Sequence, residues 1–161
     1  MANRLNKAVQ FVYKMPKAWH SFLLTKLFNT QVKYAGTSKI KLLKVSEEEA
    51  ILTIPNKKPI QNHIGGVHAC AAALLAESTT GIVVGVNLPD DKIPLIKSMT
   101  IKYKKRMQGG LIAKATLSPA YIARMKNEEK GDFIVPINIV DESGEEPIEA
   151  LMEWAWISKK K

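Results

Sequence analysis

The sequence has one cysteine, no long uncharged apolar run and no acidic residue before Glu47. The single thiol, Cys70, excludes an internal disulfide framework and any metal site built from several cysteines. The longest apolar segment, residues 69–86, carries Glu77, so it falls short of the roughly 18 uncharged residues of a membrane-spanning helix. The first residues contain no apolar signal-peptide core. We therefore expect a soluble protein of a reducing compartment, the cytoplasm.

Positive charge is concentrated in the first part of the chain. The net charge is +9, and residues 1–46 hold nine Lys or Arg and no acid, whereas residues 47–161 hold fifteen charges of each sign. Such a field attracts nucleic acid, anionic lipid or a phosphorylated small molecule. We expect no nucleic-acid partner, because the chain has no helix-turn-helix spacing, zinc finger or aromatic RNA-binding motif.

Residues 1–30 are expected to form a helical extension of two short amphipathic helices. One apolar stripe includes Val9, Phe11 and Val12, and a second includes Trp19 and Phe22. Three uses remain open for these stripes. They can pack on the core, close over an apolar ligand as a lid, or make a weak contact with a membrane surface. The lysines at positions 14, 17 and 26 favour the last of these uses.

From Val32 the apolar period changes to two, which predicts strands. We expect strands at 38–45, 50–54, 95–106, 110–118, 132–141 and 146–158, with 95–106 and 110–118 joined as a hairpin by a glycine turn. Residues 121–130 are expected to be a short helix or a loop. Residues 68–86 are apolar on nearly all faces, which predicts a long buried helix. The order indicates one α+β domain whose antiparallel sheet wraps around that helix.

The segment 62–77 carries the most specific pattern in the chain. Asn62, Gly65 and His68 precede the helix, and Leu75-Ala76-Glu77 places an acid nine residues after His68. This pattern resembles the signature of hot-dog-fold thioesterases of the phenylacetate-pathway type, and it is similar to an uncharacterised branch represented by the C-terminal domain of YiiD-like proteins. The resemblance implies a hot-dog domain over residues 31–161. It also implies a homodimer or a dimer of dimers, in which one site takes residues from two chains.

The resemblance implies hydrolysis of an acyl-CoA or acyl-carrier thioester. The helix N-terminus offers unpaired N–H groups to a carbonyl oxygen, so Gly66 and the amides of Ala69 and Cys70 are the expected oxyanion and substrate site. The resembled enzymes have glycine where this chain has Ala69 and Cys70. Glu77, two helical turns deeper, is expected to act as general base or as nucleophile.

Asn62 and His68 are expected to complete the catalytic set with Glu77. Asn62 would position the loop, and His68 would cap the helix or transfer a proton. A basic run would hold the phosphates of coenzyme A, through Lys102, Lys104 and Arg106. No metal and no cofactor beyond the coenzyme A of the substrate is implied.

Two other functions remain open at this stage. An acyl dehydratase would pair His63 or His68 with Glu77 of a second chain. A non-catalytic protein would bind an acyl ligand in the same pocket, a reading favoured by the loss of both glycines after His68. Glu77 can also be a structural carboxylate that is hydrogen-bonded to its neighbours in the helix.

Overall fold

The structure is a computed structural model that describes residues 2–159. Its helical elements are α1 (Arg4–Val12), η1 (Lys17–Trp19), α2 (His20–Gln31), α3 (Lys33–Thr37), η2 (Lys58–Ile60), α4 (Ala69–Gly85) and α5 (Pro119–Asn127). Its strands are β1 (Lys41–Val45), β2 (Glu49–Ile54), β3 (Lys92–Tyr103), β4 (Leu111–Thr116), β5 (Gly131–Val135), β6 (Ile137–Asp141) and β7 (Ile148–Ser158). No helix within these residues is long and apolar enough to cross a membrane.

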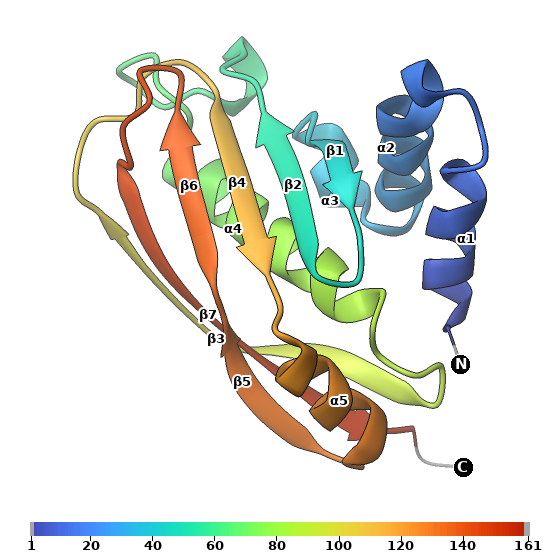
Figure 1. The fold of residues 1–161 in the computed structure, drawn as a ribbon. Coiled ribbons are helices and arrows are strands. Elements are labelled where there is room, and N and C mark those ends of the chain that lie inside the picture. The colour runs from blue at the N-terminus through green and yellow to red at the C-terminus, as the bar shows by residue number, and fades with distance from the viewer. Residues whose placement is uncertain (1, 160–161) are drawn as a thin grey trace.

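The long helix α4 lies at the centre of the fold. Two antiparallel sheets wrap around it, one in the order β1-β2-β4-β6 and the other in the order β3-β7-β5 (Figure 1). Strands of both sheets contact α4. Leu75, Ala76 and Val83 of this helix are fully buried. The predicted α+β architecture with a central buried helix is therefore confirmed.

Two predictions about the strands are wrong. The segments 95–106 and 110–118 do not form a hairpin, because β3 pairs with β7 while β4 pairs with β2 and β6. The predicted strand 132–141 is two strands separated by Pro136, and the chain passes there from one sheet to the other. Proline has no N–H to donate to a ladder, so it is a natural break between β5 and β6.

The segment after Val32 is also not extended at first, since residues 33–37 form the short helix α3. Ala35 is fully buried there, and a Cβ atom on Gly36 would lie 3.2 Å from the Cβ of Asn29 in α2. The absence of a side chain at Gly36 thus allows α3 to turn back closely on α2. The period of two begins only at Ile40.

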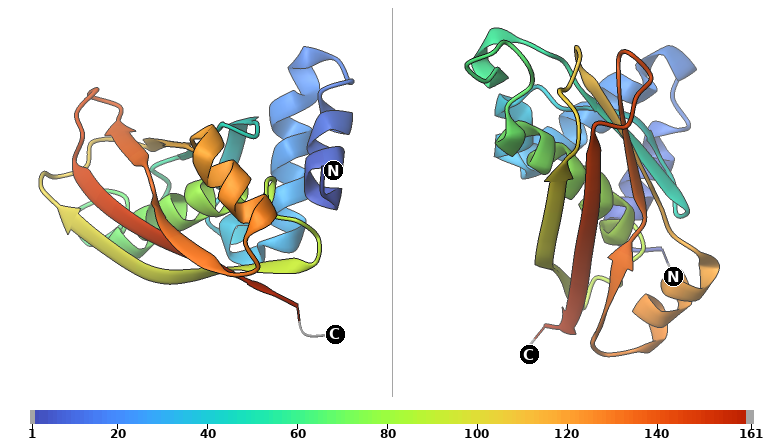
Figure 2. Two further views of the ribbon diagram at one scale, coloured as in Figure 1. Left: turned by 60° about the horizontal axis from the view of Figure 1, so that its bottom comes forward. Right: turned by 90° about the vertical axis from the view of Figure 1, so that its left-hand side faces the viewer.

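Helices α1 and α2 lie beside the outer edge of β1, as the views in Figures 1 and 2 show. Side chains of these helices take the place of a neighbouring strand. The Ser21 hydroxyl donates to the carbonyl of Leu42 (2.7 Å), and Thr25 accepts from the amide of Leu42 (2.9 Å). Asn29, one turn further along α2, donates to the carbonyl of Ile40 (3.1 Å). The polar face of α2 therefore covers a sheet edge that would otherwise be open.

The apolar stripes expected in the first 30 residues face the core only in part. Val9, Val12, Leu24 and Phe28 are buried, but Phe11, Trp19 and Phe22 are exposed. Packing on the core, one of the three uses left open for the stripes, therefore does not apply to Phe11, Trp19 and Phe22. The hydrogen-bonding residues of α2 face β1, which leaves Phe22 on the outer side of that helix, while Phe11 belongs to α1 and Trp19 to η1.

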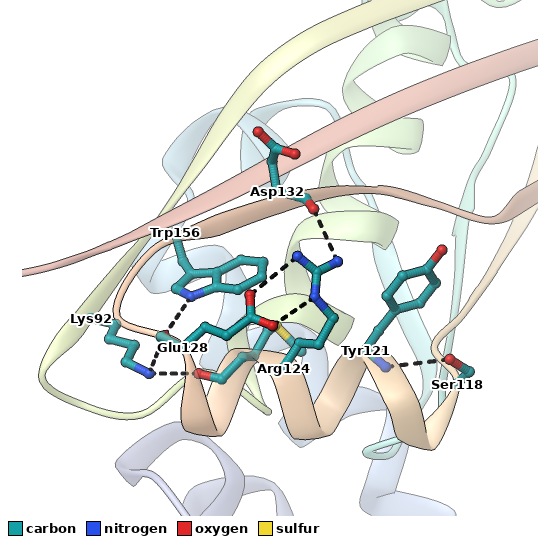
Figure 3. A network of polar contacts seen from close by, with 8 residues as sticks. Lys92, Ser118, Tyr121, Arg124, Glu128, Asp132 and Trp156 are labelled. Atoms are coloured by element: carbon teal, nitrogen blue, oxygen red, sulfur yellow. Dashed lines mark hydrogen bonds and ion pairs between the residues drawn. The ribbon is translucent and has the colours of Figure 1, made fainter.

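A polar network holds α5 against β3 and β7 (Figure 3). The buried ammonium of Lys92 donates to the carbonyls of Met125 (2.8 Å), Lys126 (3.2 Å) and Glu128 (2.7 Å) at the end of the helix. The indole of Trp156 donates to the same Glu128 carbonyl (2.9 Å). A cation at a helix C-terminus satisfies carbonyls that have no partner within the helix.

Candidate functional site

The loop before α4 is shaped by Asn62. Its side-chain oxygen accepts from the backbone amides of Ile64 (3.1 Å) and Gly66 (3.0 Å), and its backbone N–H donates to the carbonyl of Gly66 (2.8 Å). Gly65 has φ +78°, a conformation that favours glycine. Asn62 thus fixes the tight turn that brings the chain to the start of the helix. The amide of Gly66, expected in the oxyanion site, is used within this turn.

At the helix start, His68 is the N-cap. Its Nδ1 atom accepts from the amide of Cys70 (3.1 Å), and its carbonyl accepts from the amides of Ala71 (2.9 Å) and Ala72 (3.0 Å). Among the described residues, no acceptor meets the N–H of Ala69. The structure therefore offers one unpaired amide at this end, that of Ala69, where two were expected. Cys70 is exposed.

Tyr103, at the end of β3, was not identified from the sequence. Its hydroxyl donates to the carbonyl of Ala69 (2.7 Å). Burial, with a smaller contribution from the nearby Cys70, raises the pKa of Tyr103 above its usual value, so the hydroxyl stays a donor. Nothing in the sequence indicates that a lone tyrosine at the end of a strand will contact the start of a helix 34 residues earlier in the chain.

A small cavity of about 210 Å³ lies between this loop and the chain that follows β3. Its lining residues are Asn62, Ile64, Gly66, Ala69, Tyr103, Lys105, Arg106 and Met107. The structure thus brings together Asn62, Gly66, Ala69 and Arg106 from the predicted set, and it adds Tyr103 and Lys105.

The expected phosphate-binding cations are only partly available. Lys102 and Lys104 lie 3.2 and 3.4 Å from the carboxylate of Glu149, and hydrogen bonds from both lower the pKa of Glu149. Arg106 donates to the carbonyl of Ile64 (2.9 Å). Of these three side chains, only Arg106 lines the small cavity.

Glu77 lines a second, larger and mostly apolar cavity of about 350 Å³. Its walls come from α1, α2, α4, β3 and β7, with Leu5, Leu27, Phe28, Gln31, Val32, Glu77, Ser78, Gly81, Ile82, Gly85, Pro94 and Trp154 as the lining residues. Glu77 is half-buried, and within residues 2–159 its carboxylate forms no ion pair or hydrogen bond. The hydroxyl of Ser78 is buried and also has no partner among these residues. A carboxylate and a hydroxyl therefore face an apolar space without internal partners.

The two ends of the predicted site are far apart within one chain. Residues 69 and 77 are separated by eight positions on a helix that rises about 1.5 Å per residue, or roughly 12 Å. A carbonyl bound at the Ala69 amide is therefore out of reach of Glu77 of the same chain. His63 is exposed on the loop and forms no hydrogen bond within the described part of the chain. The paired histidine and carboxylate of a dehydratase are not assembled in one chain either.

Most of the chain matches the model of a known protein family. A model described as a domain of unknown function (DUF4442) matches residues 21–157. No curated protein matches the chain. The matched region begins inside the predicted extension, at the polar face of α2 that binds β1.

Several solved structures share the fold. A Pseudomonas aeruginosa protein of unknown function, described as a probable thioesterase, has a TM-score of 0.77 at 21% identity, with 90% of this chain and 97% of that chain covered. A thioesterase from Haemophilus influenzae has a TM-score of 0.64 at 15% identity, with 78% and 82% covered. A variant of another P. aeruginosa thioesterase has a TM-score of 0.69 at 13% identity, with 84% and 94% covered.

These structures confirm the hot-dog fold, and they do not bear on the YiiD-like branch. The family match covers most of the chain, including the Asn62 loop, α4 and all seven strands. The chain therefore belongs to the DUF4442 family, and it has the hot-dog fold.

Proposed function

We propose that this protein hydrolyses the thioester of an acyl-coenzyme A or acyl-carrier substrate. The observation that carries the proposal is the carboxylate of Glu77, which faces an apolar cavity with no ion pair or hydrogen bond within residues 2–159. A structural carboxylate in such a place is expected to be paired, whereas a catalytic base must be left available. The apolar walls suit an acyl group rather than a polar one.

The active unit in this proposal is a homodimer. Ala69, Ala73, Glu77, Gly81 and Gly85 recur every four residues along α4 and are each only half-buried, while the residues between them are mostly buried. Near the end of α4 the stripe is covered by the same chain, because a Cβ atom on Gly81 would lie 2.9 Å from Trp154 and one on Gly85 would lie 3.3 Å from Leu5. The open part of this face is therefore the first half of α4, around Ala69 and Ala73. If a second copy packs its own α4 antiparallel on this face, with a two-fold axis near Ala73, Glu77 of one copy lies opposite Ala69 of the other. That arrangement removes the separation of roughly 12 Å along one helix.

Strand β3 supports the same dimer. It has twelve residues and pairs only with β7, and within residues 2–159 its other edge has no neighbour. Leu95, Met99 and Tyr103 of this strand are exposed. A long apolar edge strand is a template for pairing with another chain. Pairing of two β3 strands would extend the sheet across the dimer and bring the open faces of the two α4 helices together.

The proposed reaction uses few groups. The Ala69 N–H of one copy binds the carbonyl oxygen of the thioester and stabilises the negative charge that develops on it. Glu77 of the other copy takes a proton from a water molecule as the water oxygen bonds to the carbonyl carbon. The carbon–sulfur bond then breaks, and the thiolate regains the proton from Glu77. The products are a carboxylic acid and a free thiol.

The coenzyme A or carrier part of the bound substrate would extend past the small cavity near Asn62. Arg106 lines this cavity and forms no ion pair within residues 2–159, so it is the cation on which a phosphate could be held, whereas Lys105, which also lines the cavity, is paired with Glu145. An acyl-pantetheine that lacks the nucleotide phosphates is expected to raise KM with little change in kcat, because the lost contacts lie away from the reacting carbonyl.

A test follows the release of free thiol from a panel of straight-chain and aromatic acyl-coenzyme A thioesters. Glu77→Gln is expected to lower kcat by about a hundredfold or more, since it keeps the shape and removes the base. Glu129→Gln, at an exposed position, is the matched control and should be unchanged. Turnover by Glu77→Gln at the rate of the unmodified protein would refute the proposal.

One observation favours a second candidate, a non-catalytic protein that binds the acyl ligand. The Cys70 amide is held by His68, which leaves a single unpaired amide for the oxyanion. Saturable binding of an acyl-coenzyme A by calorimetry, without thiol release for any member of the panel, would establish this candidate instead.

A further inference from the structure

The outer side of the N-terminal helices carries exposed aromatic residues that the core does not use. Phe11, Trp19 and Phe22 are 60%, 59% and 67% exposed. The inward positions of the same helices are filled by Val9, Val12, Leu24 and Phe28. Three large aromatic side chains in water, on helices whose apolar faces are already satisfied, indicate a surface that is covered by something else.

These aromatic residues gather around one turn. Phe11 is near the end of α1, Trp19 is in η1, and Phe22 is in the first turn of α2, so all three flank the connection between the two helices. This connection lies at one end of the helical pair (Figure 1). We name residues 11–22 the aromatic tip.

The charge of the aromatic tip is entirely positive. Lys14 and Lys17 lie within it and are exposed, and neither forms an ion pair within residues 2–159. No acid precedes Glu47 in the chain. Exposed aromatic residues flanked by lysines are the composition of elements that lie in the interface of an anionic bilayer, with the rings among the lipid headgroups and the lysines near the phosphates.

The aromatic tip is held in place before any partner binds. Asn3 at the start of α1 donates to the carbonyl of Gly85 (2.7 Å), and the Tyr13 hydroxyl donates to the carbonyl of Val45 (2.8 Å). The tip is therefore presented by a fixed scaffold, so little conformational entropy is lost on binding. It also lies beside β1, which is the edge opposite to the unpaired β3 in the two sheets, so dimer pairing through β3 leaves it free.

We propose that the aromatic tip docks the protein on the surface of an anionic lipid bilayer. The aromatic residues favour a bilayer over an acidic protein partner, because charge alone would serve an acidic partner and would leave three exposed rings unexplained. The proposal does not depend on the thioesterase activity.

Trp19 provides a direct signal for the test. It is the only exposed tryptophan of the three, since Trp154 and Trp156 are 8% and 1% exposed. Vesicles of phosphatidylglycerol and phosphatidylcholine are expected to shift the emission of the full chain to shorter wavelength and to sediment it, whereas pure phosphatidylcholine vesicles should do neither. Added salt should weaken the sedimentation. Trp19→Phe should keep the sedimentation and lose the shift.

Two double variants separate the aromatic and electrostatic parts. Trp19→Ala with Phe22→Ala should weaken the partition coefficient about tenfold or more, and Lys14→Glu with Lys17→Glu should do the same. Lys57→Glu with Lys58→Glu removes the same charge from an exposed segment elsewhere and should change it by less than about threefold. All these positions are exposed, so the variants are expected to fold. Equal binding of the aromatic double variant and the unmodified protein would overturn the proposal, and so would no binding to the anionic vesicles. It would also be overturned if the two lysine double variants weakened binding equally, because binding would then depend on net charge alone.

Discussion

The hydroxyl of Tyr13 makes two hydrogen bonds with the backbone of Val45: it donates to the carbonyl at 2.8 Å and accepts from the amide at 3.0 Å. One side chain from the end of α1 thus satisfies both backbone groups of the last residue of β1. Together with Ser21, Thr25 and Asn29 it covers the outer edge of the four-stranded sheet. The N-terminal helices are therefore part of the sheet's hydrogen-bonded structure.

Tyr13→Phe is expected to lower the free energy of unfolding by about 1–2 kcal/mol, because it leaves both backbone groups of Val45 without their partner. Urea unfolding followed by circular dichroism measures the change. Tyr34→Phe removes a hydroxyl from an exposed position and is the matched control. An equal effect of the two substitutions would show that the bonds to Val45 contribute nothing specific.

Lys92→Met is expected to destabilise the fold by about 1–3 kcal/mol. The substitution keeps the apolar stem and removes the cation, which leaves the carbonyls of Met125 and Lys126 without that donor at the end of α5. Hydrogen exchange should show faster opening of α5 and β5 than of α4. Lys130→Met, at an exposed position nearby, should leave both measurements unchanged.

Ala69→Pro tests the unpaired amide at the helix start. Proline suits the first helical position, and His68 has φ −65° and ψ 142°, a conformation compatible with a following proline. The substitution removes the N–H with little expected change in stability. We expect kcat to fall by about a hundredfold or more. An unchanged kcat in a stably folded variant would remove Ala69 from the mechanism.

A site that takes Ala69 from one copy and Glu77 from the other predicts that two inactive variants regain activity when they form a mixed dimer. In a mixed dimer of Ala69→Pro and Glu77→Gln chains, one site pairs the intact Ala69 with the intact Glu77, and the other site lacks both. Unfolding and refolding an equal mixture should restore about a quarter of the activity of the unmodified protein, because half of the dimers are mixed and each has one working site. A site contained in a single chain would give no rescue.

Asp141 predicts a pH dependence of stability. Burial alone would raise the pKa of Asp141, but hydrogen bonds from the Ser143 hydroxyl and from the amides of Gln108, Ser143 and Glu145 outweigh burial and hold the pKa below its ordinary value. A carboxyl with a lowered pKa in the folded state stabilises the fold above its unfolded pKa of about 4, and this contribution is lost as the pH falls through the folded pKa.

Asp141→Asn should therefore lower the urea midpoint at pH 7. The difference from the unmodified protein should shrink below about pH 4, and a difference that is constant with pH would contradict the role.

Much of the fold could be predicted from local patterns. The apolar residues of 69–85 surround their helix, and the alternation in residues 40–54 follows the pleat of β1 and β2, so both were found. The pairing of strands was not found in full. The glycine turn suggested that β3 and β4 are a hairpin, whereas β3 pairs with β7, which begins 45 residues after β3 ends. Which strand a long segment joins depends on packing around α4, and no local pattern contains that information.

The outward orientation of Trp19 and Phe22 shows the same limit. Their spacing is that of a core-facing stripe, but the hydroxyls of Ser21 and Thr25 bind β1 and set the rotation of the helix. Glu77 was singled out from the sequence, as were Asn62 and His68. Tyr103 and Lys105 were not, because they reach the helix start only through the path of β3.

The sequence by itself determined the buried helix, the acid within it and the excess of positive charge in the first 46 residues, because these follow from composition and from periods of a few residues. Only the tertiary structure decided which amide at the helix start is unpaired, which residues surround Glu77 and which aromatic side chains stay in water. Those features depend on contacts between segments far apart in the chain, where geometry and hydrogen bonding select one arrangement among many that the same local patterns allow.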